Sequence, residues 1–171
     1  NSTRNPIQVR EKVGYLPEDV GFYDDMTGPE NLMYTARLNG IPDKEAKVKA
    51  LELMKRVGLE DQLKKKTGKY SRGMRQRLGL ADVLIKNPEI IILDEPTRGI
   101  DVGTKTEIQK LVIELADQGK SLIFISSEIE EMLRTCSKLV VLRDGQEVGE
   151  ITEELTQGHV MQSIAGGGRN E

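Results

Sequence analysis

Two adjacent carboxylates, Asp94 and Glu95, end the apolar segment 90–93 and are followed by Pro96. An ionised carboxylate at the edge of a core costs free energy unless a metal ion or hydrogen bonds offset the cost. Ligands of α/β sheets bind at the carboxyl ends of the strands. Because Mg²⁺ takes one or two carboxylates and completes its shell with water and phosphate oxygens, Asp94 suits a Mg²⁺ site and Glu95 suits positioning a water. The alternative is that both carboxylates only cap the following turn.

A second segment, residues 70–77, suits the binding of an anion. Ser71 and Gly73 open a predicted helix, where backbone N–H groups and the helix dipole attract an anion such as phosphate. Basic residues without an intervening acidic residue strengthen the local positive field. They are Lys64, Lys65, Lys66, Lys69, Arg72, Arg75 and Arg77. The alternative is a solvated basic face with a capping serine, and for the lysines alone we favour that alternative.

These two segments must be positioned by elements that the apolar spacing predicts. Strands are expected over residues 12–17, 89–94, 121–125 and 138–142, and the pair Asp144-Gly145 predicts a hairpin return over 146–151. Helices are expected over 27–39 (capped by Thr27 with Glu30), 43–58 (capped by Asp43), 72–86, 102–118, 128–136 and from 152 onward. Strands that alternate with helices indicate right-handed βαβ units and a mainly parallel sheet.

Composition excludes several classes of protein. A length of 171 residues suits one compact domain, and single Cys and His residues exclude a disulfide framework and a Cys/His zinc cluster. The net charge of −3 gives no global attraction to nucleic acid. No uninterrupted apolar run exceeds four residues, against about 20 for a membrane-spanning helix. The first residues lack the pattern of a secretory signal, so we expect a cytoplasmic protein.

Together the two segments resemble the nucleotide-binding subunit of ATP-binding cassette (ABC) transporters, and the resemblance covers nearly the whole chain. Residues 71–76 are similar to the family's signature motif, usually Leu-Ser-Gly-Gly-Gln, in the variant of efflux-type cassettes. Residues 90–95 resemble the Walker B strand, and residues 96–101 resemble the loop after it. The resemblance implies an α/β fold: a P-loop NTPase-like core with a mainly parallel sheet, incomplete at the N-terminus, plus a helical lobe that carries the signature motif.

The resemblance also implies ATP and Mg²⁺ as cofactors and a role for each matching residue. Asp94 would hold Mg²⁺, mostly through water, and Glu95 would activate the water that attacks the γ-phosphate. Ser71 and Gly73 would contact that phosphate on the opposite subunit of a head-to-tail dimer, and Asp101 would tie the two halves together. The cofactor-binding residues expected in full are Ser71, Arg72, Gly73, Met74, Asp101 and Glu18.

Three features depart from the family pattern. No Gly-x-x-x-x-Gly-Lys-Ser/Thr occurs in the sequence. Because the family's phosphate loop precedes the strand at Tyr15, we expect this chain to be the C-terminal two thirds of a cassette that binds nucleotide weakly or not at all by itself. Glu18 replaces the glutamine that links Mg²⁺ and water to the membrane partner, and is a second metal candidate. Glu128, a second catalytic candidate, replaces the switch histidine, so hydrolysis by this half-site is expected to be slow or absent.

The expected organisation follows the same resemblance. Residues 1–18 form a core strand and Q-loop-like segment, 19–87 the helical lobe with the signature motif, 88–151 the α/β core with the Walker B, D-loop and H-loop positions, and 152–171 a tail helix. The expected partners are a second nucleotide-binding subunit and a transmembrane permease, with no nucleic acid, at the cytoplasmic face of the membrane. Candidates for a groove that binds a short permease helix are Phe22, Tyr23, Met26, Leu32 and Met33. The alternative is that these side chains pack inside the lobe.

The sequence is consistent with three hypotheses about function. The first is the ATPase subunit of an ABC transporter. The second is a degenerate or regulatory half-site, which the substitution at Glu128 suggests. The third is a soluble non-transport cassette, which the acidic balance and the lack of a second cassette disfavour. The direction of transport is open as well, because the signature resembles efflux cassettes while Ser126-Ser127-Glu128 resembles sugar importers.

Overall fold

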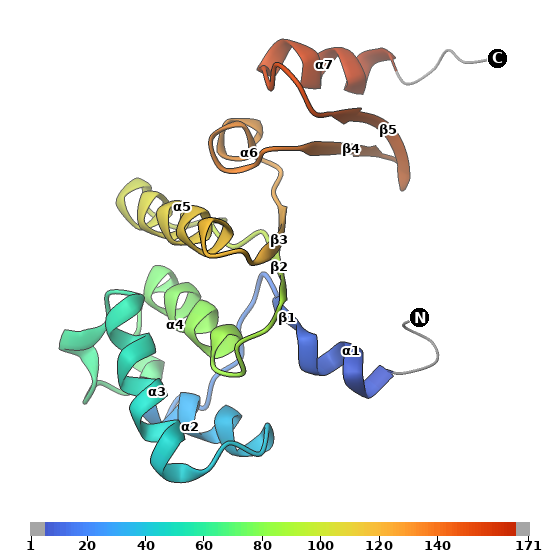
Figure 1. The fold of residues 1–171 in the computed structure, drawn as a ribbon. Coiled ribbons are helices and arrows are strands. Elements are labelled where there is room, and N and C mark those ends of the chain that lie inside the picture. Colours follow the sequence, from blue (N-terminus) through green and yellow to red (C-terminus); the bar gives the residue numbers. More distant parts are fainter. Residues whose placement is uncertain (1–5, 167–171) are drawn as a thin grey trace. The chain divides into compact units, whose positions relative to one another are not determined.

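The computed structural model describes residues 6–166 of the chain (Figure 1). By its internal contacts the chain divides into two units, residues 1–125 and residues 126–171. Each unit has its own hydrophobic core.

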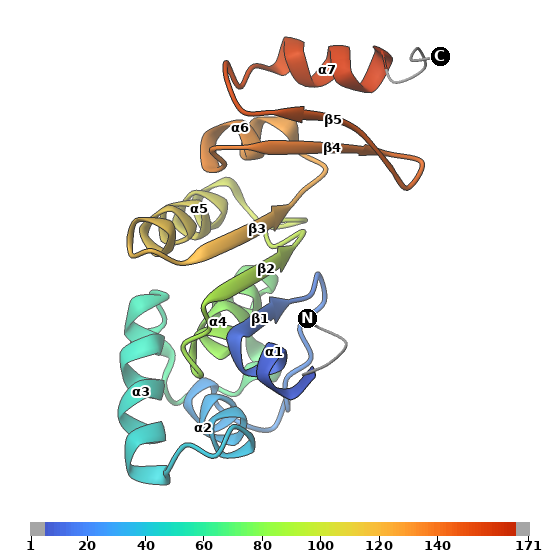
Figure 2. The same cartoon turned by 45° about the vertical axis from the view of Figure 1, so that its right-hand side comes forward.

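A three-stranded parallel sheet is the framework of the first unit (Figure 2). The strands are β1 (Val13–Leu16), β2 (Ile90–Asp94) and β3 (Ser121–Ile125), in the order β1-β2-β3. All pairings are parallel, which confirms the predicted topology. A short helix that the sequence did not predict, α1 (Pro6–Lys12), leads into β1.

The two faces of this sheet differ. Leu16, Ile91 and Leu93 lie on one face and are at most 2% exposed. On the other face Tyr15 and Ile123 remain about half exposed, at 54% and 51%. The apolar run 90–93 predicts cover on both faces, whereas the described residues cover only one of them.

Helices pack against the covered face and extend into a lobe. They are α2 (Gly28–Leu38), α3 (Asp43–Arg56), the 3₁₀ turns Glu60–Gln62 and Thr67–Lys69, α4 (Arg72–Leu84) and α5 (Val102–Asp117). The predicted capping box at Thr27 and Glu30 is confirmed. The predicted cap at Asp43 is wrong: Pro42 occupies the cap position, and the Asp43 carboxylate instead pairs with Arg37 at 2.7 Å.

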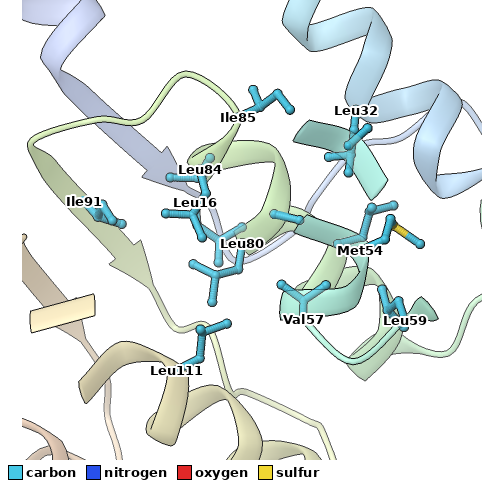
Figure 3. Packing of buried hydrophobic residues seen from close by; sticks show 14 of the residues in the cluster. Leu16, Leu32, Met54, Val57, Leu59, Leu80, Leu84, Ile85, Ile91 and Leu111 are labelled. Atoms are coloured by element: carbon cyan, nitrogen blue, oxygen red, sulfur yellow. The ribbon is translucent and has the colours of Figure 1, made fainter. Parts of the chain in front are cut away.

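One hydrophobic core joins the sheet to the lobe (Figure 3). Leu16 and Ile91 from the sheet, Leu80 from α4, and Leu32 and Met54 from the lobe are all nearly or fully buried. Burying a side chain of this size contributes about 1.5–3 kcal/mol. Helix α4, whose first turn carries the signature-like residues, is therefore anchored by the same core that anchors β2.

The second unit is a hairpin with two helices. Helix α6 (Ile129–Thr135) precedes β4 (Leu139–Arg143) and β5 (Gln146–Ile151), which pair antiparallel, and α7 (Gln157–Gly166) follows. The predicted turn is confirmed, since Asp144 and Gly145 both have positive φ, as a two-residue hairpin turn of this kind requires. The last helix begins five residues later than predicted from Thr152, after a left-handed residue at Glu154. In the described part of the chain, no helix combines the length and hydrophobicity needed to cross a membrane.

Candidate functional site

The carboxylates Asp94 and Glu95 lie where β2 ends. In the parallel register Asp94 is opposite Ile125, and the N–H of Glu95 donates to the carbonyl of Ile125 at 2.9 Å. Glu95 has φ +46°, in the left-handed region that a residue with a Cβ seldom adopts. Backbone strain of this kind concentrates at functional sites. The left-handed residue is thus the one for which the family resemblance predicts activation of the attacking water.

Asp94 is held by a neutral donor. The hydroxyl of Tyr15 donates to Asp94 Oδ2 at 2.9 Å, and this bond is the main reason that the pKa of Tyr15 is raised. Among the described residues, no lysine or arginine forms an ion pair with Asp94. Its negative charge is thus left for a cation, and a half-buried carboxylate at a strand end is a ligand type that Mg²⁺ accepts. Within the same residues no group of three His, Cys, Asp or Glu side chains forms a metal cage, so any Mg²⁺ would need water and phosphate oxygens as well.

Sequence reasoning missed Tyr15. The signal lies in the register: Tyr15 is opposite Ile92, which is two residues before Asp94. Alternate residues of a strand share a face, so Tyr15 and Asp94 lie on the same face of adjacent strands. Once β1 and β2 are paired, the contact follows, but the sequence alone does not show which strands are neighbours.

The first turn of α4 carries the residues predicted to bind an anion. Ser71 is the N-cap, and its Oγ accepts from the N–H of Met74 at 3.2 Å. Ser71 and Arg72 are exposed, and the first turn contains no acidic residue. Gly73 is buried where α4 meets α5. A Cβ at this position would come within 2.8 Å of Thr104 Cγ2. Glycine here lets α4 approach the start of α5 closely.

Asp101 caps α5 beside this contact. Its Oδ1 accepts from the N–H of Thr104 at 2.9 Å and its Oδ2 accepts from the Thr104 hydroxyl at 2.8 Å. These bonds, the backbone one first, lower the pKa of Asp101. Asp101 is therefore an ionised cap whose partner Thr104 is also the residue against which Gly73 packs.

Glu18 joins the same neighbourhood through arginines. Its Oε1 lies 3.0 Å from Arg98 Nη1 and 3.6 Å from Arg72 Nη2. Its backbone carbonyl accepts from Gln76 Nε2 at 2.6 Å. The structure thus brings together Glu18, the signature segment and the loop after Glu95. A role of Glu18 as a metal ligand requires its carboxylate to leave the two guanidinium groups.

Glu128 belongs to the second unit. It is the N-cap residue of α6, and its N–H donates to Ser126 Oγ at 3.0 Å. Ser126 Oγ also donates to Oε2 of the buried Glu131 at 3.2 Å. A local turn therefore fixes the backbone at Glu128. Its expected role beside Glu95 stays a prediction.

The five groove candidates of the lobe differ in how far their side chains are exposed. Leu32 is fully buried, and Phe22 and Met33 are partly buried and pack against the core. Met26 is half-buried, whereas Tyr23 is 49% exposed. For Leu32 the alternative of packing inside the lobe is correct, because a side chain with no exposed surface cannot bind a partner. Tyr23 is the exposed member of the set.

Comparison with known proteins identifies relatives that are named as ATP-binding proteins. The profile of the ABC transporter family matches residues 2–98. The chain is 33% identical to the ABC transporter ATP-binding protein NatA of Bacillus subtilis over 147 residues, which cover 85% of this chain and 60% of NatA. It is 39% identical to the bacitracin transport ATP-binding protein BcrA of Bacillus licheniformis over 153 residues, 88% of this chain and 49% of BcrA.

A third relative is named as an importer. The fructose import ATP-binding protein FruK of Bifidobacterium longum is 34% identical over 168 residues, which cover 92% of this chain and 33% of FruK. The chain thus spans no more than about 60% of the length of these three relatives. One of these relatives is named for import and another for bacitracin transport, so their names assign no direction of transport to this chain.

Proposed function

The chain belongs to the ABC transporter family, and from that premise we propose that it is part of an ATP-binding subunit that hydrolyses ATP to power transport. The observation that carries the proposal is the end of β2, where the Asp94 carboxylate is held by the Tyr15 hydroxyl and Glu95 stands in a left-handed turn. This arrangement suits positioning and charge stabilisation, which are what phosphoryl transfer chiefly needs.

We assign the roles as follows. Asp94 would hold Mg²⁺, with Tyr15 orienting its carboxylate. Glu95 orients a water and accepts its proton at a carboxylate oxygen. When bound, Mg²⁺ neutralises charge that develops on the transferred phosphoryl group.

The signature segment completes the proposed site. Ser71 and Gly73 present a helix N-terminus to the γ-phosphate held by a second nucleotide-binding subunit, and Arg72 and Met74 flank that contact. Asp101 helps to join the two subunits, and Glu18 leaves its arginines to approach the metal. A membrane-embedded permease is the proposed second partner, which would place the subunit at the cytoplasmic face. Because no Gly-x-x-x-x-Gly-Lys-Ser/Thr occurs among the 171 residues, we propose that they do not hydrolyse ATP by themselves.

The test is Glu95→Gln in the full-length protein. We expect ATP hydrolysis to fall by at least about a hundredfold, while nucleotide binding and dimerisation with ATP are retained. Glu89→Gln is the matched control, since Glu89 directly precedes the same strand and pairs with the exposed Lys12 at 2.9 Å. If the Glu95 variant turned over ATP as fast as the control, Glu95 would not be the base.

A degenerate half-site is the second candidate function, and the carboxylate at Glu128 favours it. A carboxylate cannot donate a hydrogen bond as a histidine does unless it is protonated. Glu128→His in the full-length protein distinguishes the two. A gain in hydrolysis supports an active site slowed by Glu128, whereas an unchanged low rate together with retained ATP binding supports a regulatory half.

A further inference from the structure

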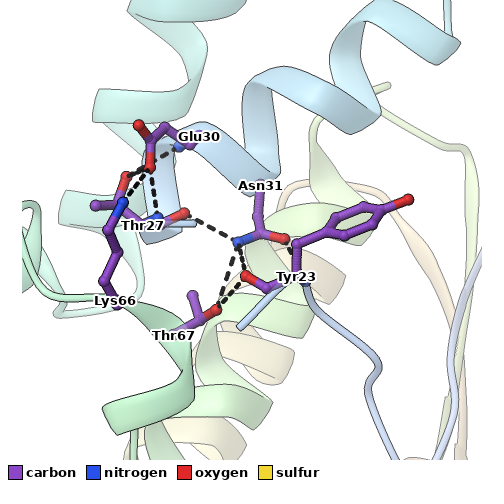
Figure 4. A network of polar contacts seen from close by, with 6 residues as sticks. All are labelled: Tyr23, Thr27, Glu30, Asn31, Lys66 and Thr67. Atoms are coloured by element: carbon purple, nitrogen blue, oxygen red, sulfur yellow. Dashed lines mark hydrogen bonds and ion pairs between the residues drawn. The ribbon is translucent and has the colours of Figure 1, made fainter. Parts of the chain in front are cut away.

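A buried polar junction in the lobe joins three segments of the chain (Figure 4). Its centre is formed by the side chains of Asn31 on α2 and Thr67 in the 3₁₀ turn Thr67–Lys69, which are 3% and 0% exposed. Around them lies the loop of residues 23–27. We call this the Asn31–Thr67 junction.

Both polar atoms of the Asn31 amide have hydrogen-bond partners. Its Oδ1 accepts from the N–H of Tyr23 at 3.0 Å. Its Nδ2 donates to the carbonyls of Thr27 at 3.0 Å and Tyr23 at 3.3 Å, and lies 3.5 Å from Thr67 Oγ1. Because burying an amide without hydrogen-bond partners costs free energy, these bonds favour this conformation of the Asn31 side chain over other rotamers.

Thr67 fastens the same loop from the other side. Its Oγ1 donates to the carbonyl of Tyr23 at 2.9 Å, and its N–H donates to the carbonyl of Met26 at 2.8 Å. The N–H of the next residue, Gly68, donates to the carbonyl of Asp24 at 3.0 Å. Three hydrogen bonds therefore tie the turn to the loop without any contribution from the Asn31 side chain.

The junction continues into the signature-like helix. Thr67 lies four residues before Ser71, and the intervening Tyr70 donates its N–H to the carbonyl of Thr67 at 3.0 Å. From within α4, Arg75 Nη1 donates to the carbonyl of Thr67 at 3.1 Å and to Asp24 Oδ1 at 2.8 Å. The loop of residues 23–27 and the first turn of α4 are thus both hydrogen-bonded to Thr67.

We propose that Asn31 and Thr67 are positioning residues that fix Ser71 relative to the loop 23–27, so that a displacement of this loop moves the start of α4. Tyr23 is an exposed aromatic side chain of this loop: the residue is 49% exposed, and its ring points away from the junction (Figure 4). The ring packs edge-on against Tyr34, with 5.0 Å between the centroids. What Ser71 binds rests on the proposed function. The mechanical link does not, because it is made of hydrogen bonds within the lobe.

The test is amide hydrogen exchange in the full-length protein. Thr67→Val keeps the shape but removes the hydroxyl, whereas Thr67→Ser keeps the hydroxyl. In the Val variant we expect exchange to accelerate by about tenfold at Tyr23, Gly68 and Met74, the last because its N–H is held by the Ser71 cap. The Ser variant should stay close to the parent protein.

A matched control lies at the opposite end of α2, where Asn39 is the C-cap residue. Asn39 is exposed, and among the described residues its side chain donates to the carbonyl of Thr35 alone, at 2.8 Å, so Asn39→Ala should leave exchange at Met74 unchanged. If the Thr67→Val protein does not fold, Asn31→Ser is used instead, because the shorter serine side chain does not reach Thr67. Acceleration at Tyr23 without any change at Met74, or equal acceleration over α2 and α3, would overturn the proposal.

Hydrolysis gives the second measurement. If Ser71 contacts nucleotide, Thr67→Val should lower kcat severalfold and change KM for ATP by less than about twofold, since the contact is made only after ATP is bound. Equal effects of Thr67→Val and Thr67→Ser on kcat would overturn the positioning role. A parent protein that does not hydrolyse ATP at all would defeat the proposed function, while the exchange data would still decide the link.

Discussion

Asp82 on α4 offers a sharp test of the packing described above. Its Oδ1 is buried without a hydrogen-bond partner, in contrast to the Asn31–Thr67 junction. Burial raises the pKa of Asp82, and a hydrogen bond from Thr35 and the charge of Lys86 only partly oppose the rise. Folding therefore shifts Asp82 toward its protonated form relative to the unfolded chain. We expect Asp82→Asn, which is neutral at every pH, to stabilise the protein where Asp82 is ionised.

The magnitude follows from the cost of burying the ionised carboxylate, which the neutral amide of the same shape avoids. One unit of raised pKa corresponds to about 1.4 kcal/mol, so the gain in free energy of unfolding should be on the order of 1 kcal/mol near pH 7. The sign with pH is definite. Because the folded pKa lies above the unfolded value of about 3.9, the stability from protonated Asp82 is fully present below that value and is lost as pH rises through the folded pKa.

Urea denaturation of the parent and variant across this pH range, followed by helical circular dichroism, measures the effect. Asp117→Asn on α5 is the control, since that side chain is exposed and should change stability by less than about 0.5 kcal/mol. The gain from Asp82→Asn should appear near neutral pH and vanish in acid. A gain that is the same at both ends of the range, or no gain beyond the control, would refute the reasoning.

Three further substitutions probe the site and its support. Gly73→Ala should destabilise by about 1–3 kcal/mol in thermal unfolding, because the added methyl would displace Thr104; an unchanged melting temperature would mean that α4 and α5 are not in close contact. Tyr15→Phe removes the donor to Asp94 and should raise the Mg²⁺ concentration needed for half-maximal hydrolysis severalfold in the full-length protein while kcat at saturating Mg²⁺ changes little; an unaltered Mg²⁺ requirement would contradict the orienting role. Leu93→Ala, at a fully buried position, should cost about 2–5 kcal/mol in urea denaturation, and a cost below 1 kcal/mol would argue against a packed core under β2.

Local features were predictable from the sequence where one segment decides the outcome. The Thr27–Glu30 capping box and the Asp144-Gly145 hairpin turn depend on side chains a few residues apart, and both are present. Asp43 shows the limit of the same reasoning. Its carboxylate satisfies the cap rule equally well, but Arg37 at the end of the preceding helix binds it instead.

Contacts between segments were not predictable in the same way. The bond from Tyr15 to Asp94 joins residues 79 positions apart and depends on which strands are neighbours. The pairing of Glu18 with Arg98 likewise depends on the path of the loop after Glu95. Motif spacing thus identified the carboxylates at the end of β2. The partners Tyr15 of Asp94 and Arg98 of Glu18 became visible only from the strand pairing and the path of the loop.

Under the role proposed for Glu95, the left-handed backbone at this residue opposes stability to chemistry at a single position. Glycine would adopt φ +46° without the steric cost that a Cβ brings, which is about 1–2 kcal/mol. Backbone geometry at this position therefore favours a residue that carries no carboxylate. If Glu95 is the proposed base, a library sorted only by folding would be drawn toward proteins that lack it. Engineering for robustness in this chain should hold residue 95 constant and seek its gains at sites such as Asp82.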